Sequence, residues 1–112
     1  MKFLLLHYFD ESELDFAAGP DEADPEEVAW VTEMETTGVK LNGGRLRPSS
    51  EAKVLRIRAG EQLLTDGPFA ETKEQIAGFD VLECGSLAEA IEVAARHPTA
   101  RMGTFELRQF WE

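Results

Sequence analysis

The chain alternates between apolar runs of strand length and amphipathic stretches, which predicts an α+β domain. Residues 2–9 form a continuous apolar and aromatic run, typical of a central strand that is covered on both faces. Residues 39–46 predict a short strand interrupted by glycines, and residues 75–84 predict a second central strand. Residues 104–111 alternate between apolar and polar positions and predict the last strand.

Two helices are predicted by their capping residues. Asp24 precedes Pro25 and an acidic first turn, and Gly38 is placed to end a helix over residues 25–37. Ser86 and Glu89 have the spacing of a capping box at the start of a second helix, which Pro98 must follow. The residues expected to form the buried stripe of this second helix are Leu87, Ala90, Ile91, Ala94 and Ala95.

Residues 52–65 predict a β-hairpin, because two short strand-like segments flank the turn residues Ala59 and Gly60. The full order is then strand, helix, strand, hairpin, strand, helix, strand. We expect a ferredoxin-like split βαβ fold with an inserted β-hairpin, in which both helices cover one face of an antiparallel sheet. The other face would expose a large apolar patch, so a second subunit is expected to cover it and form a dimeric α/β barrel.

Composition narrows the possible partners. The 112 residues predict a single domain, residues 1–112. The net charge of −11 and the lack of a basic stripe argue against nucleic acid and against an anionic membrane surface. No apolar run reaches the length of a membrane span, and the first ten residues do not form a signal peptide, so a cytoplasmic location is expected. The single cysteine, Cys84, excludes a disulfide within the chain.

The segment Asp66-Gly67-Pro68-Phe69-Ala70-Glu71-Thr72-Lys73-Glu74, followed by Ile76-Ala77-Gly78-Phe79, resembles the signature of the DGPF family of YciI-related proteins. Supporting matches are the opening at Lys2, the Gly43-Gly44-Arg45-Leu46 segment, the start of the second helix and His97-Pro98. The resemblance covers nearly the whole chain. It implies a dimeric α/β barrel of ferredoxin-like subunits and no established activity.

A His-Asp pair has been proposed as the site of the YciI type, with the histidine on the first helix. The predicted first helix of this chain has no histidine, and His97 stands where that type has its acid. The pair therefore does not carry over intact. By the same resemblance, some relatives look associated with sigma factors of the extracytoplasmic type, which implies an alternative function as a non-catalytic accessory or regulatory dimer with a partner of that type.

Asp66 and His97 are the residues expected to be catalytic, because a carboxylate beside a histidine can transfer protons. The alternatives are that Asp66 only stabilises its own turn and that His97 only caps a helix end. Glu71, Lys73, Arg45 and His7 are the expected substrate-binding residues. For them the alternatives are solvated faces, surface ion pairs and, for His7, packing beside the apolar residues of its strand.

No metal site or cofactor is expected, because the two histidines and one cysteine match no ligand spacing and no phosphate or dinucleotide motif is present. If the chain is an enzyme, the residues favour cofactor-independent acid-base chemistry on a small carbonyl, lactone or aromatic compound. Whether it is an enzyme or an accessory dimer stays open from the sequence.

Overall fold

The computed structural model describes residues 1–16 and 24–112. The predicted loop between residues 10 and 24 therefore lies partly outside the described residues. The strands, helices and 3-10 helices follow one another as β1 (Lys2–Asp10), η1 (Glu11–Glu13), α1 (Pro25–Thr36), β2 (Lys40–Arg45), η3 (Ser49–Glu51), β3 (Lys53–Arg58), β4 (Glu61–Asp66), β5 (Glu74–Glu83), α2 (Leu87–Ala95), η4 (Pro98–Arg101) and β6 (Thr104–Gln109).

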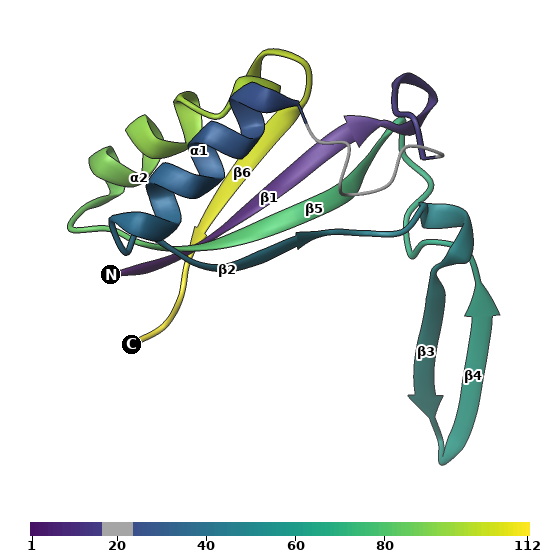
Figure 1. Ribbon diagram of the computed structural model, residues 1–112. Coiled ribbons are helices and arrows are strands. Elements are labelled where there is room, and N and C mark those ends of the chain that lie inside the picture. The colour runs from purple at the N-terminus through teal and green to yellow at the C-terminus, as the bar shows by residue number, and fades with distance from the viewer. Residues whose placement is uncertain (17–23) are drawn as a thin grey trace.

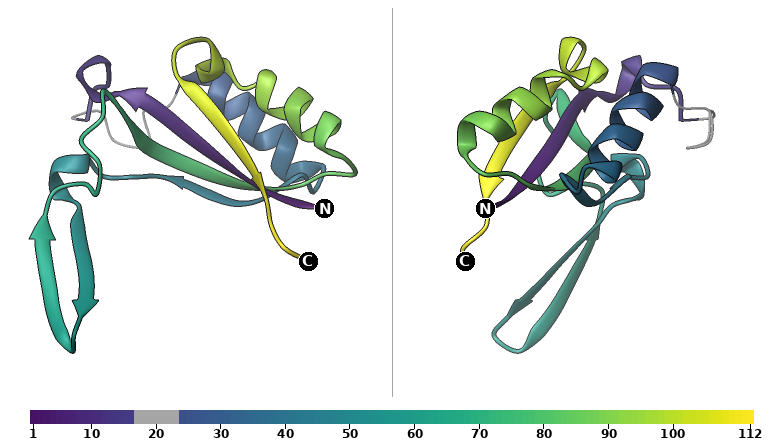
Figure 2. Two further views of the ribbon diagram at one scale, coloured as in Figure 1. Left: turned by 180° about the vertical axis from the view of Figure 1, so that it is seen from behind. Right: turned by 60° about the vertical axis from the view of Figure 1, so that its left-hand side comes forward.

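Four strands form one antiparallel sheet in the order β2-β5-β1-β6. Each helix connects two strands that are separated by a third strand, so β5 lies between β2 and β1, and β1 lies between β5 and β6. Both helices cover the same face of the sheet (Figures 1 and 2). This α+β arrangement is consistent with the predicted ferredoxin-like fold.

The core lies between the helices and the two central strands. Phe3 and Leu5 of β1 and Leu82 of β5 are almost completely buried, as the apolar run at the start of the chain predicts. The residues that alternate with them point to the other side of the sheet. The β6 strand ends at Gln109, two residues before the predicted end, and Trp111 is fully exposed.

Helix α1 begins and ends where its sequence predicts. The Asp24 side chain accepts a hydrogen bond from the Glu26 N–H, and Gly38 adopts a φ of +78° just after the helix. Trp30 and Met34 are buried in the core, whereas the side chain of Val28 stays half exposed.

Helix α2 is capped by Ser86, whose hydroxyl accepts a hydrogen bond from the Glu89 N–H, and the Glu89 carboxylate accepts one from the Gly85 N–H. The predicted buried stripe is only partly right. Ala90 and Ala94 are buried, but Leu87 and Ile91 are each 52% exposed. Ala95 is exposed as well, and the buried face is instead completed by Val93.

Strands β3 and β4 pair only with each other and form a separate two-stranded sheet. Their turn has positive φ at Ala59 and Gly60, 51° and 81°, which is the geometry of a type I′ hairpin turn. The hairpin projects from one end of the main sheet, on the side away from the helices (Figures 1 and 2). We call residues 53–66 the arm. Neither helix among the described residues is long and apolar enough to cross a bilayer.

The two helices are joined by a buried hydrogen bond, in which the Trp30 indole N–H donates to the Val93 carbonyl at 2.9 Å. Replacing Trp30 by Phe removes the donor and part of the buried ring, and we expect the free energy of unfolding to fall by about 1–2 kcal/mol. Urea unfolding followed by circular dichroism measures this loss. The control is Trp111→Phe at the exposed C-terminal position. Equal stability of the two variants would contradict the assigned bond.

Candidate functional site

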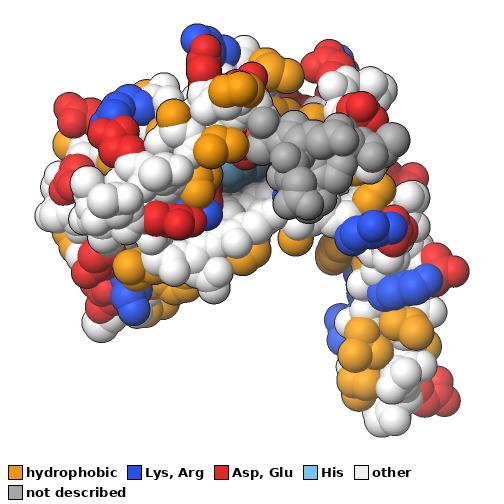
Figure 3. Space-filling model, viewed as in Figure 1, with side chains coloured by type: hydrophobic (Ala, Val, Ile, Leu, Met, Phe, Trp, Pro, Cys, Tyr) orange, Lys and Arg blue, Asp and Glu red, His pale blue; other side chains and the backbone are white. Residues whose placement is uncertain are grey.

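A cavity of about 630 Å³ opens between α1 and the helix-facing side of the sheet. Its volume is in the range of small-molecule sites in proteins. Figure 3 shows histidine surface inside this hollow. The lining residues are His7, Phe9, Glu13, Leu14, Asp15, Asp24, Glu27, Val28, Val31, Thr32, Lys40, Gly44, Arg45, Ala77, Gly78, Phe79, Asp80, His97, Thr99 and Met102.

The bottom of the cavity holds a buried pair of side chains from the two central strands. His7 Nε2 lies 2.8 Å from Asp80 Oδ2, and only 11% and 6% of these two side chains are exposed. Because a carboxylate can only accept, the imidazole must donate through Nε2. In the neutral ring Nδ1 then carries the lone pair, and no described residue has a hydrogen bond with it. The pair is thus arranged as a carboxylate-oriented base.

The second oxygen of Asp80 faces a cation. Lys40 Nζ lies 3.6 Å from Asp80 Oδ1 and 3.5 Å from Glu35 Oε1, and the lysine side chain is only 12% exposed. Gly43 makes this approach possible, because a Cβ at that position would lie 2.4 Å from Asp80 Oδ1. The buried carboxylate therefore has an imidazole on one oxygen and an ammonium group near the other.

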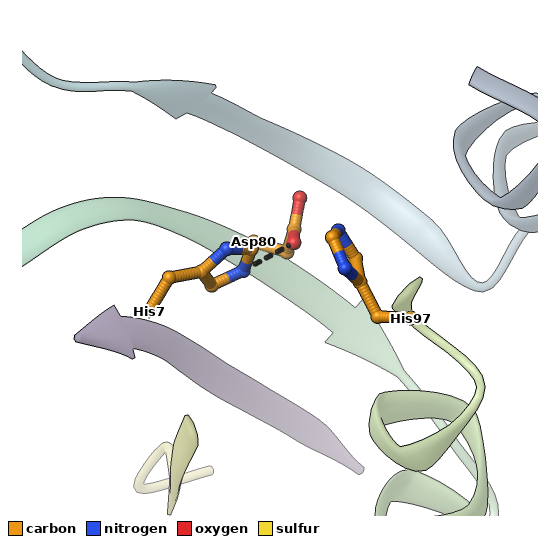
Figure 4. Close-up of side chains that lie close together, drawn as sticks. All are labelled: His7, Asp80 and His97. Carbon is orange, nitrogen blue, oxygen red and sulfur yellow. Dashed lines mark hydrogen bonds and ion pairs between the residues drawn. The ribbon is translucent and has the colours of Figure 1, made fainter. Parts of the chain in front are cut away.

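His97 comes from the segment between α2 and β6, and its side chain is 2% exposed. Figure 4 shows His7 and His97 on either side of Asp80. The Thr99 N–H donates to His97 Nδ1 at 3.2 Å, and the Thr99 hydroxyl oxygen lies 2.7 Å from the same nitrogen, so the imidazole is the N-cap of η4. Since Nδ1 accepts, the neutral ring carries its proton on Nε2. His97 thus does cap a helix, and it also presents an N–H donor at the bottom of the cavity.

Burial keeps this second imidazole neutral. Desolvation, with smaller contributions from the nearby His7 and Lys40, lowers the pKa of His97 to about 4. Its ring lies edge-on to His7 at 5.2 Å and to Trp30 at 4.6 Å between centroids. The cavity therefore contains two imidazoles in different roles, one with a lone pair to receive a proton and one with a proton to share.

Three of these groups have the types of atoms that bind metals. The ligand atoms of His7, Asp80 and His97 all lie within 4.8 Å of one another. Two observations favour proton transfer over metal binding. His97 Nδ1 accepts from the backbone, so Nε2 carries a proton and not a lone pair. The Lys40 ammonium group lies beside Asp80, where it would repel a cation.

The structure brings together three of the six residues that sequence reasoning selected. His7, Arg45 and His97 line the cavity, whereas Asp66, Glu71 and Lys73 are not among its lining residues. Asp66 ends the arm with its side chain 83% exposed, and a hydrogen bond from the Lys53 ammonium 2.5 Å away lowers its pKa. The expected partnership between Asp66 and His97 is therefore not formed within this chain.

Asp80 was missed, although the sequence contains a signal for it. By the period of two, Asp80 shares a face of its strand with Leu82 and Cys84, which are both buried. A charged residue on the core-facing side of a central strand must be compensated or functional. The same reasoning applied to β1 finds His7 among Phe3, Leu5 and Phe9.

The sequence matches the model of the YCII-related domain over residues 1–112. The chain belongs to the YCII-related family. It is also 38% identical over 112 residues to an uncharacterised protein of Rhizobium meliloti (strain 1021), an alignment that covers 96% of this chain and 90% of that protein. Family membership agrees with the resemblance seen in the sequence, and neither comparison assigns an activity.

The tautomer and charge of His97 are directly measurable, because the chain has two histidines. We expect the ¹⁵N shifts of His97 to show a neutral ring protonated on Nε2 from pH 8 down to about pH 5, since its pKa is about 4. In the unfolded chain an ordinary histidine takes up its proton near pH 6.5. Stability that His97 contributes above pH 6.5 is therefore lost as the pH falls toward 4, by about 3 kcal/mol in total.

The matched control for this measurement is His97→Gln, which cannot titrate. As the pH falls from 6.5 to 4, the unfolding free energy of the natural chain should decrease relative to that of this variant. The groups that face His97 are His7, Asp80, Lys40 and Glu27, and they are the same in both proteins. A His97 ring that is protonated on Nδ1, or that is charged at pH 6, would contradict the assignment.

Proposed function

We propose that the cavity is the site of cofactor-independent acid-base chemistry on a small carbonyl, lactone or aromatic compound. The observation that carries this proposal is the buried His7-Asp80 pair at the bottom of a ligand-sized cavity, next to a neutral His97 that offers an N–H group. Titratable groups that converge on a cavity, one of them with a strongly lowered pKa, are typical of proton-transfer sites. The alternative, a non-catalytic accessory dimer, requires no such pair.

In the proposed reaction, His7 removes a proton from the carbon next to the carbonyl group. The C–H bond breaks, the proton moves to Nδ1, and the electron pair forms the C=C bond of an enolate whose charge lies on the former carbonyl oxygen. Asp80 accepts the Nε2–H hydrogen bond throughout and stabilises the imidazolium. Return of the proton to the same carbon exchanges it with solvent, and return to another carbon isomerises the compound.

The enolate oxygen needs a donor, and His97 Nε2–H is the proposed one. A neutral imidazole is a suitable donor because it does not lose its proton easily to the enolate. The Lys40 ammonium group lies beside Asp80, and the Glu27 carboxylate lies 3.9 Å from His97 Nε2. Donors fixed before the reaction stabilise the developing charge without reorganisation. His7 comes from β1, Lys40 from β2 and His97 from the segment between α2 and β6. The sheet and the helical layer therefore both hold the site.

Hydrogen-deuterium exchange tests this chemistry without knowledge of the natural substrate. The protein is incubated in D₂O with cyclohexanone, acetophenone and γ-butyrolactone, and NMR follows loss of the proton next to each carbonyl. We expect exchange above the buffer rate for at least one compound. His7→Gln removes the proposed base, and Asp80→Asn removes the carboxylate that fixes the tautomer of His7. Each substitution should lower the exchange rate by about 10²-fold or more.

Asp66→Asn is the matched control, because it makes the same change at the acid that the sequence alone selects. It should leave the exchange rate unchanged. Circular dichroism and urea unfolding confirm that each variant folds. If exchange is lost in Asp66→Asn and kept in Asp80→Asn, the proposed assignment is wrong. If folded protein accelerates exchange of none of the compounds, the accessory-dimer alternative becomes the better hypothesis.

We also propose that the chain forms a homodimer through the sheet face away from the helices. This face is apolar along both central strands and only half buried in the single chain. Cross-strand neighbours there include Leu4 with Val81 and Leu6 with Phe79. A second copy laid against it would close a barrel between the two sheets, as the family resemblance implies.

The arm supports the same proposal. An isolated two-stranded hairpin is at best marginally stable in water. Leu55 is paired with Leu64, and together with Ile57 these side chains give one side of the arm an apolar row that is between 55% and 58% exposed. The arm also carries three bases, Lys53, Arg56 and Arg58, and two acids, Glu61 and Asp66. A second copy therefore offers the apolar row of the arm a surface to cover it.

Light scattering measures the mass of the particle in solution. We expect a dimer for the natural chain and a shift toward monomer for Leu6→Arg on the sheet and for Leu55→Arg on the arm. Leu55 is 58% exposed in the single chain, so its substitution does not disturb the monomer core. Ile91→Arg, at a position of α2 that is 52% exposed, is the control and should stay dimeric. A monomeric natural chain at micromolar concentration would contradict the proposal.

A further inference from the structure

The charges around the cavity are unequal. Among its described lining residues, the carboxylates are Glu13, Asp15, Asp24, Glu27 and Asp80, and the permanently charged bases are Lys40 and Arg45. Since both histidines line the cavity and His97 is held neutral, they do not reverse this balance near pH 7. A bound molecule therefore lies in a field that is negative overall.

The two bases are already engaged with the protein. Lys40 lies between Glu35 and Asp80, and Arg45 donates to the backbone carbonyl of Asp15 and lies over the ring of Phe16. Holding a carboxylate in the cavity would require one of these cations to give up such contacts. Charge-assisted hydrogen bonds of the bidentate kind, which normally bind a carboxylate, are thus unfavourable here.

The remaining wall is apolar. It is formed by Phe9 and Met102, by Leu14 from the loop after η1, and by Val28 and Val31 of α1. Val28 is half exposed because it lines the cavity. Apolar walls with a few polar groups at one end are typical of sites for small organic molecules.

We infer that the ligand is an uncharged, mainly apolar carbonyl compound, and that the cavity discriminates against its carboxylate analogues. This inference rests on the proposed function, since it names the class of compound on which the His7-Asp80 pair acts. The carbonyl end lies at His97 and the apolar body lies against α1. The acidic groups at the cavity, Glu27 among them, raise the free energy of an anion more than that of a neutral molecule of the same shape.

Matched pairs of compounds test the charge selectivity. Acetophenone and methyl 4-acetylbenzoate are compared with 4-acetylbenzoate, and cyclohexanone with 4-oxocyclohexanecarboxylate. Binding is measured by titration of the ¹⁵N signals of the two histidine rings at low ionic strength. We expect each carboxylate to bind at least tenfold more weakly than its uncharged partners. High salt should reduce this ratio, because it screens charges near the surface.

Glu27→Gln should raise the affinity for each carboxylate and so reduce the ratio of the affinities of the uncharged compound and its carboxylate partner. Its matched control, Glu92→Gln on the exposed side of α2, lies outside the cavity lining and should not change the ratio. Equal or tighter binding of the carboxylates would overturn the inference, and so would a failure of every uncharged compound to bind. Selective binding of uncharged compounds without proton exchange would support the inference and contradict the proposed reaction.

Discussion

The structure depends on a carboxylate held out of water. Removing an ionised group from solvent costs several kcal/mol unless other groups compensate it. Asp80 is compensated from both neighbouring strands, by the His7 N–H on one side and by the Lys40 ammonium on the other. Gly43 adds the space that the carboxylate needs. A slip of one residue in either strand would turn these groups to opposite faces, so strand register and the charged site are specified together.

The second imidazole is controlled by backbone geometry. His97 follows α2, and the turn that ends this helix places the Thr99 N–H against Nδ1. The backbone conformation after α2 therefore determines which nitrogen of the His97 ring carries the proton. Burial against Trp30 and Phe105 then keeps the ring neutral. Two histidines at the same cavity thus differ because one is oriented by a side chain and the other by the main chain.

Much of the scaffold can be predicted from the sequence because its signals are local. The apolar run of β1, the Asp24 and Ser86 caps, and the turn at Ala59 each depend on a few adjacent residues. The buried side of α2 was predicted less well, because helical spacing alone allowed a face with Ile91 as readily as one with Val93.

The site could be predicted only in part, since its members lie on β1, β2, β5 and the segment before η4. His7 and His97 were selected for their chemistry, but the partner acid was sought in the most unusual motif, at Asp66. Asp80, the acid that pairs with His7, lies in a strand without an unusual motif. Only the pairing of β1 with β5 places Asp80 beside His7. That pairing cannot be read from any short stretch of the sequence.

The base of the arm leads to a different consequence. The main sheet extends to the base of the arm, where the Leu46 N–H donates to the Ala77 carbonyl. The two ends of the arm are joined there by a hydrogen bond from the Gly67 N–H to the Ala52 carbonyl. The hairpin is therefore a separable module, since loop closure entropy depends only weakly on the length of the inserted segment. Its strands pair with no strand of the main sheet, which holds the groups beneath α1. Substitutions in the arm and substitutions at the cavity therefore fall in different parts of one small chain.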